Sequence, residues 1–138
     1  MILMYGSQQD YDNMTGKESG GRPAWDAEAT AAVHKFMGEF SQALIDSGEY
    51  VDTRGLAAPV HSRRVQVRGG VPVVTDGPYP ETQEVLAGYW IVECASFDRA
   101  TEIAAGLGRT PDPTGRGAYH DSYVDVRPIV DGMSDLDF

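Results

Sequence analysis

The stretch from Val74 to Thr82 carries the residues whose types and spacing favour chemistry most. An apolar strand signal ends at Asp76, a Gly-Pro turn follows, and Tyr79 and Glu81 come directly after it. Glycine reaches backbone angles closed to other residues and proline fixes φ at about −65°, so these three side chains are expected to have little freedom. This pre-ordering suits a site, and it equally suits a structural turn that Asp76 would cap.

Histidine is the natural proton carrier at neutral pH, and the chain contains three. His34 falls in a helical pattern beside the apolar stripe, so it could point toward the sheet edge and meet a loop acid such as Asp76. A neighbouring carboxylate would orient the imidazole and hold its charge, as in a general acid/base pair. The alternative is a helix-flank histidine with one ordinary hydrogen bond. His61 and His120 lie in loops and are interpreted as surface residues or local caps.

Other side chains could hold a substrate near this pair. Arg127 follows Val126 in an alternating strand, and its guanidinium could bind a carboxylate through two hydrogen bonds. It could instead pair across strands with Asp125 or Glu93. Aromatic residues of strands are core more often than ligands, and acidic residues after a turn are often simply solvated. The candidate substrate-binding residues are Tyr5, Tyr79, Glu81, Tyr89 and Arg127.

Motifs for bound metals and nucleotides are missing from the sequence. It has no Gly-rich phosphate loop, no paired cysteines, no His-Glu-x-x-His and no Gly-x-Ser-x-Gly elbow. We therefore expect no metal and no cofactor.

Charge and length restrict the class of protein. With 138 residues and 15.0 kDa, the chain suits one domain. Its net charge of −10 argues against binding to nucleic acid or anionic membranes, which require clustered cations. No apolar run approaches the ~20 residues of a membrane helix, the N-terminus lacks a secretion signal, and Cys94 is the only cysteine. We expect a cytoplasmic protein whose partners are small molecules or copies of itself.

The first half of the chain contains one strong helix signal. Apolar residues recur at three-and-four spacing from Asp26 to Ser47, with Asp26 able to cap the start and Gly48 the end. The remaining segments of this half are predicted as a strand at 2–5, a polar loop at 6–23, and an extended, irregular region at 50–62.

The second half begins with a hairpin signal. Strict alternation predicts a strand at 64–68, Gly69-Gly70 predicts a two-residue turn, and 71–75 returns. The later segments are predicted as a central strand covered on both faces (89–95), a helix capped by Ser96 (97–107), a polar loop (108–121), a last strand (123–129) and an acidic, mobile tail (130–138).

This order of elements predicts an α+β domain spanning residues 1–138. Strand, helix, strands, helix and strand make the split βαβ arrangement of ferredoxin-like folds (βαββαβ), with an added β-hairpin. Because two helices cover only one face of such a sheet, the other face needs a partner. We expect a homodimer whose sheets pack face to face around a cavity.

Several motifs resemble the YCII-related superfamily in its DGPF branch. They are the string from Val74 to Glu84 followed by Gly88-Tyr89-Trp90-Ile91-Val92, with flanking matches at 2–6, 55–59 and 124–129. Tyr79 and Gln83 replace the Phe and Lys usual in that family. The resemblance covers most of the chain and implies a ferredoxin-like, dimeric α+β barrel. It implies little about function, because fold does not fix activity; some YCII relatives work with a His and Asp pair, which are groups suited to proton transfer.

Two functions are consistent with these residues. The first is a cofactor-free enzyme of lyase or isomerase type, in which His34 and Asp76 move a proton and Arg127 holds a small organic acid. The second is a non-catalytic binding or accessory protein that carries or senses a small metabolite. Geometry distinguishes them, because the enzyme requires His34 and Asp76 to reach one solvent-connected cavity.

Overall fold

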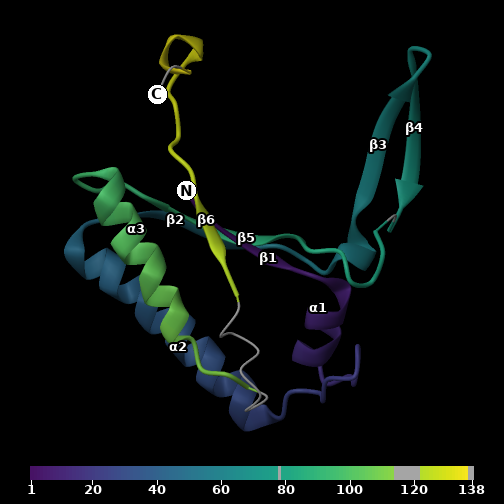
Figure 1. Cartoon of the computed structure of the whole chain (residues 1–138), viewed down its shortest axis with the longest axis horizontal. Helices are drawn as coiled ribbons and strands as arrows, with labels where there is room; N and C mark the ends of the chain where they lie inside the picture. The colour runs from purple at the N-terminus through teal and green to yellow at the C-terminus, as the bar shows by residue number, and fades with distance from the viewer. Residues whose placement is uncertain (78, 114–121, 137–138) are drawn as a thin grey trace.

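The computed structural model describes residues 1–77, 79–113 and 122–136, and its main feature is a four-stranded antiparallel sheet with helices on one side (Figure 1). The strands lie in the order β2-β5-β1-β6, which is the ferredoxin-like order with a hairpin inserted between the second and third strands. The predicted α+β, ferredoxin-like fold is confirmed. In chain order, the elements are β1 (Ile2–Gly6), α1 (Gln8–Met14), α2 (Ala27–Ser47), β2 (Tyr50–Gly55), η1 (Pro59–His61), β3 (Arg63–Arg68), β4 (Val71–Asp76), β5 (Val85–Val92), α3 (Phe97–Ala105), η2 (Gly106–Arg109), β6 (Val124–Val126) and η3 (Met133–Asp135).

Strand β5 is the central strand, as predicted, because it pairs with β1 on one side and β2 on the other. It spans Val85–Val92 rather than the predicted 89–95, so it begins four residues earlier and ends three residues earlier. The expectation that both of its faces are covered is not met within one chain, since the helices lie on a single side of the sheet (Figure 1).

Helix α2 follows the predicted range and caps. The Asp26 carboxylate accepts a hydrogen bond from the Ala29 N–H at 2.7 Å, which satisfies one free donor of the first turn. Gly48 ends the helix with φ at 77°, a left-handed conformation that glycine adopts without a steric penalty. In α3, the Ser96 hydroxyl caps the first turn as expected, but the α-helix ends at Ala105 and continues as the 3-10 turn η2.

The polar loop predicted for residues 6–23 contains helix α1, so that prediction is wrong at residues 8–14. Ser7 and Asp10 form a capping box, in which the Ser7 hydroxyl accepts from the Asp10 N–H and the Asp10 carboxylate accepts from the Ser7 N–H. A single-sided apolar stripe is missing from this short helix, and for that reason hydrophobic periodicity did not reveal it.

Strands β3 and β4, with the turn between them, form a two-stranded ribbon that we call the arm (residues 63–76). Gly69 and Gly70 have φ values of 56° and 79°, as a two-residue hairpin turn of the predicted kind requires. The arm projects from the sheet on the side away from the helices (Figure 1). It pairs with no strand of the four-stranded sheet.

The C-terminal part of the described chain is less regular than predicted. The last strand β6 spans only Val124–Val126 rather than residues 123–129, because its pairing with β1 ends where β1 begins. Residues 127–136 then leave the sheet, again on the side away from the helices (Figure 1). Most of the predicted loop at 108–121, including His120, lies outside the described residues. Among the described helices, none has the length and apolar character needed to cross a membrane.

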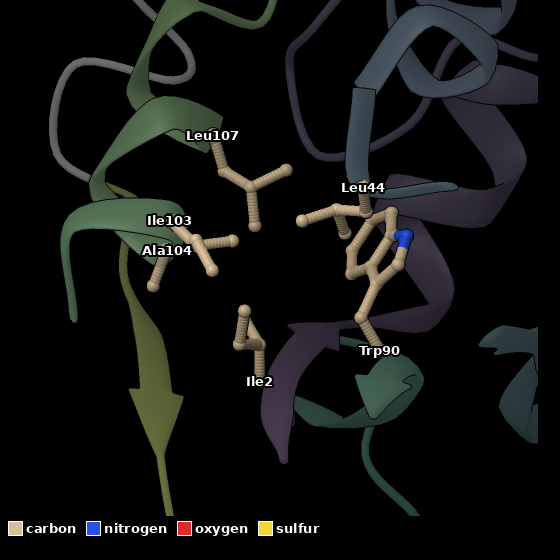
Figure 2. Close-up of a cluster of buried hydrophobic side chains, with 6 residues drawn as sticks. All are labelled: Ile2, Leu44, Trp90, Ile103, Ala104 and Leu107. Atoms are coloured by element: carbon tan, nitrogen blue, oxygen red, sulfur yellow. The ribbon is translucent and has the colours of Figure 1, made fainter. Parts of the chain in front are cut away.

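The core lies between the sheet and the helices α2 and α3 (Figure 2). Trp90 of β5 packs its ring against Phe40 at a centroid distance of 5.1 Å, and its indole N–H donates to the Ser41 hydroxyl at 3.1 Å. The indole is therefore both buried and satisfied. The buried members of this cluster are Ile2, Leu44, Trp90, Ile103, Ala104 and Leu107.

Candidate functional site

A cavity of about 470 Å³ lies next to this core, between the N-terminal half of α2, the α1 region and the sheet. Apolar and aromatic side chains make up most of its wall, among them Met37 of α2 and Trp90 of β5. Cavities of this size with mainly apolar walls are typical of small-molecule sites. The lining residues are Met4, Tyr5, Gly6, Asp10, Tyr11, Asn13, Met14, Arg22, Trp25, Val33, His34, Met37, Thr53, Arg54, Gly55, Leu56, Glu84, Ala87, Gly88, Tyr89, Trp90 and Ser122.

His34 lines this cavity. In the sequence it follows buried Val33 and precedes Met37 by three residues. Residues three apart are neighbours on a helix, so His34 and Met37 lie next to each other on the α2 surface, and all three side chains line the cavity. The residue is exposed, and no partner for its imidazole is present among the described residues. The ring is thus available to a ligand as a hydrogen-bond donor or acceptor.

One part of the cavity wall is a polar network built on α1. Asn13 is only 2% exposed, and its amide donates to three backbone carbonyls, those of Lys17, Ser19 and Arg22. The Arg22 guanidinium in turn lies 2.8 Å from the Asp10 carboxylate. Burial would raise the pKa of Asp10, but hydrogen bonds from Ser7 and the ion pair with Arg22 outweigh it and hold this pKa below its usual value. Asp10 is therefore a structural carboxylate that stays ionised at neutral pH.

Tyr11 connects α1 to the ends of two strands. Its hydroxyl donates to the Leu56 carbonyl at 2.7 Å, and the Ala87 carbonyl lies 3.4 Å away. Burial raises the pKa of this phenol, so Tyr11 remains protonated and acts as a donor. The loop between β1 and α2 is fixed in this way against the sheet.

Two further tyrosines form hydrogen-bonded pairs with acids near the start of β5 and the edge strand β6. The Tyr5 hydroxyl donates to Asp125 at 2.8 Å, and the Tyr123 hydroxyl donates to Glu84 at 3.0 Å, with the two rings 5.6 Å apart. The hydrogen bond to Asp125 and burial raise the pKa of Tyr5, and the hydrogen bond to Glu84 raises that of Tyr123. Neither phenol is a base at neutral pH.

Asp76 does not line this cavity. It lies at the end of the arm strand β4, where its carboxylate accepts from the Arg63 guanidinium at 2.9 Å and its side chain is 78% exposed. One chain therefore does not bring Asp76 together with His34 in the described cavity.

The remaining predicted residues divide between the cavity and its surroundings. Tyr5 and Tyr89 line the cavity, whereas Tyr79, Glu81 and Arg127 do not. The Tyr79 ring lies beneath the Arg64 guanidinium at 4.6 Å, and the Glu81 carbonyl accepts from the Gln9 N–H. Arg127 is exposed, and its backbone N–H pairs with the Met1 carbonyl.

Sequence reasoning missed the α1 contribution to the site, namely Asp10, Tyr11, Asn13 and Arg22. The one local signal for it is the Ser7-x-x-Asp10 spacing of a capping box. Within the described part of the chain, no cluster of three or more His, Cys, Asp or Glu residues is arranged to hold a metal ion.

Comparison with known proteins agrees with this fold. A sequence model of the YCII-related domain matches residues 1–124. A similar protein is an uncharacterised protein of Rhizobium meliloti (strain 1021), 28% identical over 107 residues, an alignment that covers 78% of this chain and 81% of the relative.

Proposed function

Because this chain belongs to the YCII-related family, and because a fold does not by itself specify a ligand, we propose from the cavity that it binds a small organic acid. The observation that supports this function is the imidazole of His34, which has no partner among the described residues and lies at the wall of a cavity of about 470 Å³ that is otherwise mainly apolar. Small-molecule sites commonly combine an apolar wall with a few polar groups that fix orientation.

The charges around the cavity indicate how such a ligand would lie. Arg22 and Arg54 are each within 2.8 Å of a carboxylate, so their charges are already paired. Within the described part of the chain, His34 and the Tyr89 hydroxyl are the lining groups left to meet a ligand carboxylate, while Met37 and Trp90 offer surface to an apolar group. The ligand is then an aromatic or aliphatic monocarboxylic acid.

A catalytic version of this function keeps His34 as the proton carrier in a cofactor-independent lyase or isomerase reaction. It is favoured by the Glu84 carboxylate, which also lines the cavity and could serve as a second acid/base group. In this version Asp76 has no assigned role, because it does not line the cavity.

The proposal retains a cytoplasmic homodimer. The sheet face away from the helices lacks a covering layer within the described chain (Figure 1), and two-fold packing against an identical face would cover it.

Benzoate is a suitable probe of the proposed site, since it combines an apolar ring with one carboxylate. In isothermal titration calorimetry, His34→Leu should weaken benzoate binding about tenfold, because one hydrogen bond to a charged group is lost. His61→Leu is the matched control, since His61 is exposed in η1 and does not line the cavity.

Benzyl alcohol distinguishes the ligand class, because it keeps the ring and lacks the charge. We expect His34→Leu to change benzyl alcohol binding much less than benzoate binding. Equal benzoate affinity in the wild type and His34→Leu would remove His34 from the site.

A further inference from the structure

The arm presents an apolar face to water. Cross-strand pairing places Val65 opposite Val74 and Val67 opposite Pro72, so these four side chains share one face of the ribbon. Val65 is 64% exposed, Val67 is 72% exposed and Val74 is 57% exposed. An isolated two-stranded hairpin is marginally stable in water, and an exposed apolar patch marks an interaction surface.

The arm is also basic in an acidic protein. It contains three arginines, Arg63, Arg64 and Arg68, and one acid, Asp76, which gives +3 − 1 = +2, whereas the whole chain carries −10. The rest of the chain therefore carries −10 − 2 = −12. Arg63 is paired with Asp76, and Arg64 lies over Tyr79. Arg68, beside the turn at the tip of the arm, lies on the opposite face of the ribbon from these valines. Within the described residues it contacts only a neutral group, the Gln66 amide at 3.3 Å, so its charge is available to a partner.

A complementary surface lies in the C-terminal segment, residues 129–136. Its apolar side chains are exposed, with Ile129 at 52%, Met133 at 83% and Leu136 at 59%. It also contains Asp131 and Asp135 and no Lys or Arg. The C-terminal segment thus offers apolar groups and negative charge where the arm offers apolar groups and positive charge.

These two surfaces lie at opposite ends of the sheet of one chain. The arm leaves β2 and returns to β5 at the end of the sheet where Gly6 pairs with Val85. The C-terminal segment leaves at the other end, where the Arg127 N–H donates to the Met1 carbonyl. Both project on the side away from the helices, the side of the uncovered sheet face (Figure 1).

We propose that the arm of one copy docks on the C-terminal segment of a second copy, so that two arms clasp a face-to-face dimer. This inference rests on the proposed homodimer. A two-fold axis that lies between two facing sheets and runs perpendicular to their strands reverses the strand direction. The arm of each copy is then brought to the end of the sheet from which the C-terminal segment of the other copy leaves. The alternative axis, parallel to the strands, would place the two basic arms at the same end, and like charges disfavour that arrangement.

Charge reversal tests the clasp in sedimentation equilibrium experiments on the full chain. Arg68→Glu should weaken dimerisation about tenfold, because it places like charges at the contact. The tail variant Asp131→Lys/Asp135→Lys should weaken it similarly. Combining the arm and tail changes should restore much of the lost affinity, because opposite charges face each other again. Lys35→Glu on α2 is the control for an equal change of charge elsewhere.

The outcomes separate the clasp from the dimer. Unchanged dimerisation in Arg68→Glu and in the tail variant would overturn the clasp and leave the dimer standing. A wild-type chain that sediments as a monomer at micromolar concentration would overturn both. A partial loss of dimer affinity in Arg68→Glu that the combined variant fails to recover would also contradict the clasp. Because all the substituted side chains are exposed, the circular dichroism spectra of the variants should match that of the wild type.

Discussion

Gly88 is the residue at which the sheet and the cavity wall depend most on the absence of a side chain. A Cβ atom at this position would lie 2.8 Å from the Arg54 carbonyl oxygen and 3.5 Å from Gly55 Cα. Both of these atoms belong to the backbone of the paired strand β2, which cannot move aside like a flexible side chain. The close approach of β2 to β5 beside the cavity therefore requires glycine.

We predict that Gly88→Ala lowers the free energy of unfolding by about 1–3 kcal/mol, because β2 must shift away from β5. Urea denaturation measures this change. Gly38→Ala is the matched control, since a Cβ at Gly38 meets nothing within 4 Å in helix α2. It should stabilise the protein by up to about 1 kcal/mol. Equal effects of the two substitutions would contradict this account.

At the scale of single residues, His34 lines the cavity and Asp76 does not. The position of His34 follows from helical periodicity alone, which is a local property of α2. Its pairing with Asp76 depends on where the arm points relative to α2, and no local pattern encodes that direction. The proposed pairing therefore does not follow from one chain.

Among the secondary-structure elements, an ion pair connects the start of β2 to helix α3. The Arg99 guanidinium donates two hydrogen bonds of 2.9 Å to the Glu49 carboxylate, and the Ser47 hydroxyl donates a third of 2.8 Å. The hydrogen bonds from Arg99, followed by that from Ser47, lower the pKa of Glu49 from 4.5 to about 2. They also raise the pKa of Arg99, which stays charged throughout.

The ion pair between Arg99 and Glu49 should make the stability of the protein depend on pH in the acidic range. A carboxylate with a lowered folded-state pKa contributes stability above its unfolded value of 4.5, and this contribution is lost as the pH falls toward about 2. Glu49→Gln should therefore be less stable than the wild type at neutral pH and should lose less stability between pH 4.5 and 2. Thermal melts across this range give the measurement. Identical acid sensitivity of the two proteins would show that the ion pair does not couple to folding.

Elements with a strong periodic signal were predicted well, and elements without one were not. Helix α2, the arm turn and the cap of α3 follow from apolar spacing, paired glycines and Ser96, which all act locally. Helix α1 has polar residues along most of its length and depends on a capping box. The length of β6 is set by where its partner β1 begins, which is information from a distant part of the chain.

At the scale of the whole molecule, the described cavity lies on the helix side of the sheet, within one chain. The sequence predicts a cavity between the two sheets of a dimer, because two helices cover only one face of the sheet. The number of helices does not indicate how well the covered face is filled. The space is lined by the N-terminal half of α2 and by Arg22 and Trp25, whose backbones are hydrogen-bonded to Asn13 of α1. Its volume depends on packing between distant segments, which sequence periodicity does not report.

The central claim is that this cavity binds a small organic acid, and mapping a probe by nuclear magnetic resonance tests it most directly. Benzoate titrated into ¹⁵N-labelled protein should shift the amide signals of His34, Met37 and Gly88, which line the cavity, while those of Val67 and Arg68 in the arm stay in place. Shifts confined to the arm or the uncovered sheet face, with the cavity amides unmoved, would contradict the claim.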